Sequence, residues 1–385
     1  MIGKMANRVS PAAIFLFILC TFAPVRPCFC AASAQAESRS DFAPFLEKLA
    51  GAPPDPCGAE DRGGYSGAES GFFDHASDGI IEALNATPAD SLPPAARAKR
   101  ALEKVVQVSA QINRSWPEEN RFQFEILDIR PILVVKMTLR THARFYVFGV
   151  PEKVSEKSNG PWVRVGSDSD IDSSGRDAPR SDIDLYVLHR GPSGAPRFLA
   201  RLEFSGCAGS SGIAYDAREW NTEGAGQLKT LIKQGGAIGF DSAAEFPLVG
   251  SLQTNGPVIA LPYCWFSPID TWDNPSMCAV DAYDLTGDNV VFQSRVYNRP
   301  DLLPIAKAIE YAEERDYQAV LAYCASAVVA RRLVREMPPY FFAGTLQVTR
   351  VTASKERVEL GDDPAYRFEV EKQKGRWLVT TVSRE

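Results

Sequence analysis

Histidine is scarce in this chain of 385 residues: only His75, His142 and His189 are present, far apart in the sequence. No His-Glu-x-x-His or His-x-x-His pair occurs, so a zinc hydrolase has no ligand signature. The Gly-x-Ser-x-Gly elbow and the Gly-x-x-x-x-Gly-Lys-Ser/Thr phosphate loop are also missing, which removes the usual signatures of serine hydrolases and NTPases. Lys and Arg number 42 against 48 Asp and Glu, so the basic excess expected of a nucleic-acid binder is lacking.

Long apolar runs are lacking as well, since a membrane-spanning helix needs about 20 apolar residues. The longest run, from Ala12 to Val25, is too short and follows Lys4 and Arg8. Ala32-Ser33-Ala34 then fits a cleavage site, so we predict a signal peptide over residues 1–34, with an uncleaved anchor as the alternative. The expected mature chain is exported, periplasmic or extracellular, with no transmembrane segment.

The predicted export to an oxidising compartment favours disulfides among the cysteines. No Cys-x-x-Cys occurs, so thioredoxin-like redox chemistry and zinc ribbons lack their usual signature. Cys264 and Cys278 are the closest pair after the leader and are the predicted disulfide, with Cys57–Cys207 as a weaker candidate. Cys324 lies in an apolar helical stretch, where a buried free thiol is expected.

The pattern along the chain predicts a multidomain, mainly β protein. We divide it into a loop-rich and helical N-terminal segment (35–118), an antiparallel β-rich middle domain (119–298) and a C-terminal α+β module (299–385). The middle domain is expected to be a sandwich, a barrel or a propeller-like array, because many short strands alternate with turn residues. Its expected strands are Phe122–Ile126, Ile132–Leu139, Phe145–Phe148, Trp162–Val165, Asp182–Leu188, Phe198–Phe204, Ile213–Asp216, Val258–Trp265, Ala279–Tyr283 and Val290–Val296; helices are expected near Phe42–Leu49, Asp78–Leu84, Pro94–Ile112 and Gln227–Lys233.

The last segment has two expected helices, Leu302–Arg315 and Tyr317–Arg335, followed by three strands. The strands are Leu346–Thr352, Tyr366–Glu371 and Trp377–Val382, with a hairpin turn at Gln373-Lys374-Gly375. The ending from Tyr366 to Trp377-Leu-Val resembles the terminal hairpin of NTF2-like or cystatin-like α+β domains. That resemblance implies a binding or oligomerisation module.

Two polar stretches are candidate sites. Asp168, Asp170 and Asp172 alternate like the first ligands of a calcium loop, although Pro179 occupies the position of the bidentate Glu. A weak extracellular calcium site is therefore one interpretation, and a solvated acidic loop is the favoured one.

The second stretch lies between Cys264 and Cys278 and combines aromatic with short polar side chains: Trp265, Asp270, Trp272, Asp273 and Asn274. An aromatic platform with a few oriented hydrogen bonds suits sugar or peptide recognition. The alternative is that the tryptophans cap the β core while Asp270 and Asn274 form turns.

These observations favour an exported, non-catalytic protein that binds a glycan, a peptide or a protein of the cell envelope. No catalytic residue and no cofactor other than calcium is indicated. The alternatives are an exported hydrolase that uses paired carboxylates such as Asp270 and Asp273, and a structural or assembly component of the envelope.

Overall fold

The computed structural model describes most of the chain after the leader. The described residues are 42–49, 62–86, 92–112, 114–140, 142–151, 161–168, 180–205, 210–221, 226–240, 252–254, 256–265, 267–270, 277–361 and 365–384. The predicted signal peptide, Cys57 and Cys207 lie outside these ranges. Within them no helix is long and apolar enough to cross a membrane.

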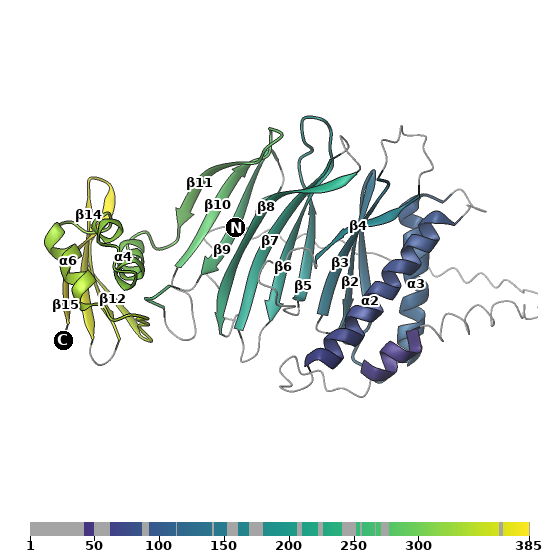
Figure 1. Cartoon of the computed structure of the whole chain (residues 1–385), viewed down its shortest axis with the longest axis horizontal. Coiled ribbons are helices and arrows are strands. Elements are labelled where there is room, and N and C mark those ends of the chain that lie inside the picture. The colour runs from purple at the N-terminus through teal and green to yellow at the C-terminus, as the bar shows by residue number, and fades with distance from the viewer. Residues whose placement is uncertain are drawn as a thin grey trace, which may run out of the picture.

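Helices cover one end of the molecule (Figure 1). Residues 42–49 are helical, as expected, and α2 (Arg62–Asn85) starts well before the helix expected near Asp78. The helix predicted over Pro94–Ile112 is confirmed as α3, and a 3-10 turn, η1 (Glu118–Asn120), follows. Phe72, Phe73 and Leu102 are buried where α2 and α3 pack on the first sheet.

The first sheet contains four antiparallel strands, of which β2 and β3 are buried on both faces. One face, with Leu133 and Val135, packs against the helices. The other face, with Ile132 and Val134, packs against the second sheet. Its strands are β1 (Gln123–Ile129), β2 (Ile132–Leu139), β3 (His142–Gly149) and β4 (Val163–Ser167).

The second sheet is a central layer, because its two faces belong to two different cores. Phe198 and Leu202 on β6 face the first sheet, whereas Leu199 between them faces the third sheet. Such two-sided burial explains why three consecutive apolar residues, Phe198, Leu199 and Ala200, are all buried in β6. The strands are β5 (Arg180–Val187), β6 (Arg197–Ser205), β7 (Ser210–Asn221) and β8 (Gln227–Phe240).

The helix predicted over Gln227–Lys233 is wrong, because this segment begins β8. Its apolar residues Leu228, Leu231 and Ile232 have helical spacing, but a β-bulge produces that spacing here. Ala217 of β7 pairs with Ile232 and Arg218 with Thr230, so Leu231 is an extra residue in β8. One inserted residue breaks the two-residue alternation and imitates a helix.

The third sheet has three strands in the order β11-β10-β9, so β11 lies at its edge. Ile259 and Leu261 of β9 pack against Leu199 and Tyr215 of the central layer. Figure 1 shows the sheets following one another, from the helices at one end to the C-terminal module at the other. The strands are β9 (Val258–Trp265), β10 (Met277–Asp284) and β11 (Val291–Tyr297).

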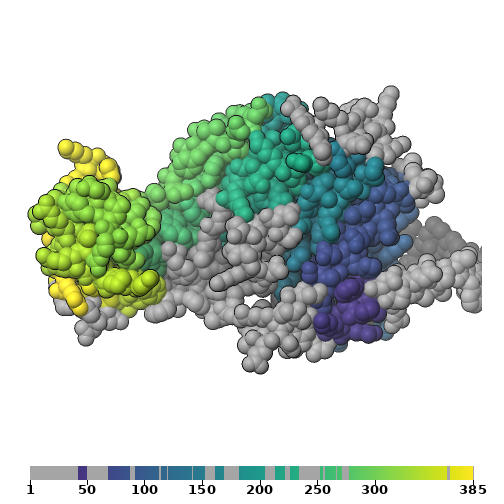
Figure 2. Space-filling view, in the orientation of Figure 1, coloured from purple at the N-terminus to yellow at the C-terminus, as the bar shows by residue number. Residues whose placement is uncertain are grey.

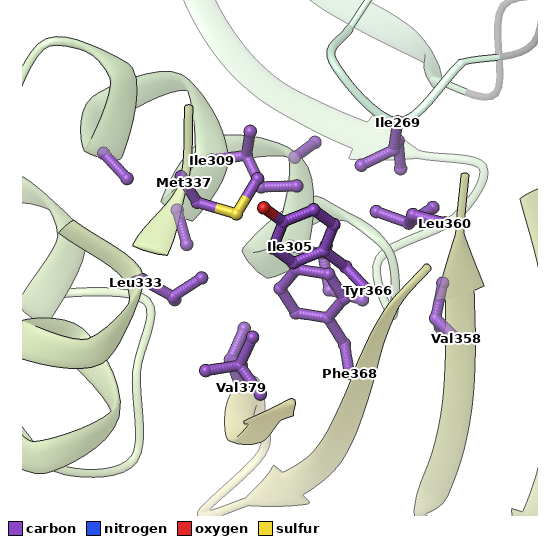
Figure 3. Packing of buried hydrophobic residues seen from close by; sticks show 14 of the residues in the cluster. Ile269, Ile305, Ile309, Leu333, Met337, Val358, Leu360, Tyr366, Phe368 and Val379 are labelled. Atoms are coloured by element: carbon purple, nitrogen blue, oxygen red, sulfur yellow. The ribbon is translucent and has the colours of Figure 1, made fainter. Parts of the chain in front are cut away.

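The C-terminal module packs three helices on a four-stranded antiparallel sheet, and its core is shown in Figure 3. Ile305 and Ile309 of α4 meet Phe368 of the sheet there. Ile269 and Met277, which precede and begin β10, complete the same core. The elements are α4 (Leu303–Glu313), α5 (Tyr317–Leu321), α6 (Ala327–Glu336), β12 (Leu346–Thr352), β13 (Lys355–Leu360), β14 (Tyr366–Gln373) and β15 (Arg376–Arg384).

Two predictions for this module need correction. The single helix expected over Tyr317–Arg335 is divided into α5 and α6, because Val379 of β15 binds the backbone between them. Its N–H donates to the Tyr323 carbonyl at 2.9 Å and its carbonyl accepts from the Ala325 N–H at 2.8 Å. The sheet also has four strands rather than three: β13 was missed, since Glu356 stands at a core position of its alternating pattern.

The β-rich fold class is confirmed, and the sheets of the middle region are stacked and open as in a sandwich. Among the described residues no sheet closes into a barrel, because each sheet has two ends in its strand order.

Candidate binding site

The predicted disulfide is confirmed: Cys264 and Cys278 lie directly opposite each other on β9 and β10 and are bonded. Trp265, the last residue of β9, is half-buried and contacts Tyr263 and Tyr297, with ring centroids 5.6 and 6.0 Å away. Asp270 is buried, and its carboxylate accepts a 2.5 Å hydrogen bond from the Ser267 N–H across a turn.

Of the five residues predicted for this loop, Trp265 and Asp270 make these contacts within the fold, and their predicted role in binding stays a prediction. Trp272, Asp273 and Asn274 lie outside the described residues, so their predicted role stays a prediction.

The predicted calcium loop is described only at its start. Asp168 follows β4 and is fully buried. Burial alone would lower the pKa of Arg144, but the charge of Asp168, the hydrogen bond with Tyr146 and the charges of Tyr146 and Asp74 together outweigh it, and the pKa of Arg144 is raised. Asp170 and Asp172 lie outside the described residues, and within the described parts no three His, Cys, Asp or Glu side chains are grouped as for a metal.

The most accessible described part of the β9–β11 sheet is its edge strand. The side chains from Val291 to Val296 are all exposed, on both faces of the sheet. Phe292 is 51% exposed and Val296 57%, which is unusual for large apolar residues in a strand. In Figure 1 β11 is the outermost strand of this sheet. Exposed apolar edges of this kind are templates for pairing with another polypeptide.

On the face of β11 that is directed toward the central layer, which we call the inner row, the guanidinium group of Arg295 is fixed by an ion pair. Arg295 of β11 pairs with the buried Asp281 of β10, through Nε–Oδ1 at 2.6 Å and Nη2–Oδ2 at 2.8 Å. The same guanidinium lies over the rings of Tyr263 and Phe292, 5.6 and 5.9 Å from their centroids. Burial and the nearby Asp281 charge raise the pKa of Tyr263, so its phenol stays neutral. The bidentate pairing fixes the guanidinium plane, which leaves a flat cation–aromatic surface beside the edge.

The outer row of the edge, on the opposite face of the sheet, is apolar. Val291 and Val296 of β11 are exposed there, and so is Val258 of β9. The register places Val258 and Val291 opposite the same residue, Asp284, so they share this face. The disulfide lies on the same face. Cys278 is two residues from Val280 in β10, so their side chains share a face, and Val280 pairs with Val296.

The free edge also presents backbone hydrogen-bonding groups. The backbone of Asn298 is hydrogen-bonded to β10, because its N–H donates to the Cys278 carbonyl at 3.0 Å. Ladder bonds alternate along an antiparallel strand, so Val296 also faces β10 while Arg295 and Tyr297 direct their backbone groups away from it. No described residue outside the sheet makes a backbone hydrogen bond to Arg295 or Tyr297.

A second arginine of the described residues joins two layers of the fold. Arg197 is fully buried between the central layer and the β9–β11 sheet, where its Nε lies 2.5 Å from Glu219 Oε2. Its other nitrogens donate to the carbonyls of Leu285 and Gly287 at 2.5 and 2.8 Å. Gly191 makes room for this pair, because a Cβ there would lie 2.7 Å from the Glu219 carboxylate.

A carboxyl pair lies where the β9–β11 sheet joins the C-terminal module. Asp301 and Glu356 are both buried and hydrogen-bond to each other. Arg299 lies 2.5 Å from Asp301 Oδ2 and 3.7 Å from Glu356 Oε2, and Arg350 lies 3.4 Å from Glu356 Oε1. The two guanidinium groups pair with the two carboxyl groups, so ion pairs connect the segment after β11 to strands β12 and β13 of the C-terminal module.

The sequence predicted a site in the loop between β9 and β10, and the structure adds the edge strand of the same sheet as a second candidate. Asp281 was the available signal, because a lone acid within Cys-Ala-Val-Asp-Ala-Tyr indicates a buried partner. The edge position of β11 had no such signal, since strand order is not encoded in a single strand.

No known family model matches this chain, and no curated protein sequence matches it. The site is therefore interpreted from its own geometry.

Proposed function

We propose that this chain is an exported, non-catalytic binding protein whose partner is an extended polypeptide that adds a strand to β11. The observation that carries the proposal is the exposure of β11 on both faces along an edge with free backbone groups. In strand addition, main-chain hydrogen bonds supply affinity and alternate side-chain positions supply specificity. On β11 the alternate positions form two rows: Val291 and Val296 on the outer face, and Phe292 and Arg295 on the inner face.

Rigidity of the sheet supports the same proposal. The disulfide joins β9 to β10, and the Arg295–Asp281 pair joins β10 to β11. A preorganised edge loses little conformational entropy when a strand is added, so more of the interaction free energy appears as affinity.

A hydrolase receives less support from the described carboxylates. Asp270 is enclosed in its own turn, and Asp301 and Glu356 are in direct contact beneath two arginines. A carboxyl pair that spans a scissile glycosidic bond is separated by about 5–9 Å. A glycan remains the second candidate ligand, because the Tyr263–Trp265–Tyr297 ring cluster borders the same strand.

The test is selection of a phage-displayed heptapeptide library on the native protein, followed by fluorescence anisotropy of a selected peptide. We expect affinity to fall at least tenfold in Val296→Lys, because a lysine on a strand edge disfavours pairing. Val328→Lys is the matched control, since Val328 is 73% exposed on α6 and lies outside this sheet.

Selected peptides that bind Val296→Lys as tightly as the native protein would contradict the proposal. So would a selection that yields no peptide, and in that case a rise in unfolding temperature with cell-wall glycans would favour the aromatic cluster instead.

A further inference from the structure

We infer that the strand received by β11 is β11 of a second copy of this chain, antiparallel, about a two-fold axis at Val296. This inference rests on the proposed function, because it names the occupant of the same edge. Three features of β11 are arranged symmetrically about Val296: the stretch with regular register, the backbone groups that point away from β10, and the side chains.

The regular segment of β11 is centred on Val296. On one side a β-bulge interrupts the ladder: Ala282 pairs with Ser294 but Tyr283 pairs with Phe292, so Gln293 is the extra residue. On the other side β11 ends at Tyr297, and Asn298 just after it still pairs with Cys278, whose N–H donates to the Asn298 side chain at 2.8 Å. Residues 294 to 298 are thus the stretch that keeps one register with β10, and Val296 is its midpoint.

The free backbone groups share this centre. Arg295 and Tyr297 direct their N–H and C=O groups outward, one on each side of Val296. A two-fold axis at Val296 places Arg295 opposite Tyr297 of the second copy, and Tyr297 opposite its Arg295. Both are hydrogen-bonded pairs, so every outward group of this segment gains a partner.

The side chains are complementary in the same register. Arg295 already lies over Tyr263 and Phe292 in its own sheet, and the axis offers it the ring of Tyr297 from the second copy. Each Arg295 is neutralised by its own Asp281, which limits repulsion between the two arginines. Val296 meets Val296 of the second copy on the outer face, where apolar and β-branched pairs stabilise a sheet.

The interface is isologous, because both copies use the same surface. Pairing over so short a segment buries less than the roughly 1,200 Å² of a standard interface. We therefore expect a weak, concentration-dependent dimer in which two three-stranded sheets become one sheet of six.

The first test is oxidation of Val296→Cys. At the axis Val296 forms a non-hydrogen-bonded pair with its copy, with Cα atoms about 4.5 Å apart, which suits a disulfide. We expect a covalent dimer on non-reducing gels at least ten times faster than for Val291→Cys, which is equally exposed on the same row but lies off the axis. Equal rates for the two variants, or no dimer of Val296→Cys, would overturn the inference.

The second test is sedimentation velocity of the protein without added cysteines. We expect a dimer fraction that grows with concentration, disappears in Val296→Lys and persists in Val328→Lys. A native protein that stays monomeric while selected peptides still bind at β11 overturns this inference and leaves the proposed function standing. Loss of both self-association and peptide binding overturns both.

Discussion

The central β5–β8 layer and the outer β9–β11 sheet each contain an arginine–carboxylate pair, and the two pairs differ in their surroundings. Arg197 in the central layer has no exposed surface and donates to Glu219 and to two carbonyls of the β10–β11 connection. Arg295 in the outer sheet is 39% exposed and pairs with a single buried carboxylate. One arginine joins two layers, and the other is held in place beside an open edge.

The difference shows where this fold keeps polar groups for stability and where it keeps them for contact. A buried charge needs every donor satisfied, because an unpaired one carries a large desolvation cost. A half-exposed charge such as Arg295, which is held by Asp281 and Tyr297, keeps part of its surface available to a binding partner. We therefore expect substitutions at Arg197 to act on folding and substitutions along β11 to act on association.

The largest expected effect is at Arg197. Arg197→Met leaves the Glu219 carboxylate buried without its cation, and we expect unfolding free energy to fall by about 3–5 kcal/mol. Arg201→Met on the same strand is the matched control and should cost about 1 kcal/mol, because its partners Asp184 and Glu203 are both more than a third exposed. Denaturant unfolding measures both.

The double variant Arg197→Met/Glu219→Leu sharpens this comparison. It removes both charges, so most of the lost stability should return. A double variant as unstable as Arg197→Met alone would mean that the carbonyls of Leu285 and Gly287, and not Glu219, dominate the role of Arg197.

The second effect concerns the disulfide of the outer sheet. Cys264→Ala/Cys278→Ala opens a loop with a sequence separation of 14, which should lower the unfolding free energy by about 3 kcal/mol. Cys324→Ala is the control within the C-terminal core, with an expected cost of about 1 kcal/mol. If the Cys264/Cys278 double variant were as stable as the native chain in denaturant, the disulfide would have no role in making the edge rigid.

Local patterns predicted much of this architecture. Strands β2 and β9 and helix α3 have the predicted bounds, because continuous apolar runs and a single apolar helix stripe are local signals. Sequence proximity, with the expectation of an oxidising compartment, was enough to predict the Cys264–Cys278 disulfide. The failures came from non-local partners: β7 forces a bulge on β8, and Val379 interrupts the helix expected after Tyr317.

The candidate site was predicted less well than the fold. Trp265 and Asp270 have the residue types of a ligand loop, but Trp265 packs against the core of the C-terminal module, which comes later in the chain, and Asp270 is buried in its own turn. Arg295 was overlooked because a lone arginine in a strand does not reveal its partner on the next strand. The exposure of β11 follows from its position at the edge of the sheet, and strand order cannot be predicted from the local sequence of one strand.

The smallest expected effect is the pH response of the joint between the outer sheet and the C-terminal module. A hydrogen bond with Asp301, together with burial, raises the pKa of Glu356. Burial alone would raise the pKa of Asp301, but the hydrogen bonds from Arg299 and Glu356 lower it. At mildly acidic pH the pair therefore shares one proton, held on Glu356.

The raised pKa of Glu356 means that the folded protein binds this proton more tightly than the unfolded chain does. The stability it contributes is full below the unfolded pKa of about 4.3 and is lost as pH rises through the folded value. Glu356→Gln keeps a neutral group at all pH values, so its unfolding free energy should fall less than that of the native chain from about pH 4.5 to 7. Glu359→Gln, on the same strand but in an exposed pair with Arg367, is the control and should keep the native slope. A native slope in Glu356→Gln, measured by denaturant unfolding across this range, would mean that the arginines alone hold the joint. The outer sheet would then be coupled to the C-terminal module by charge and not by a shared proton.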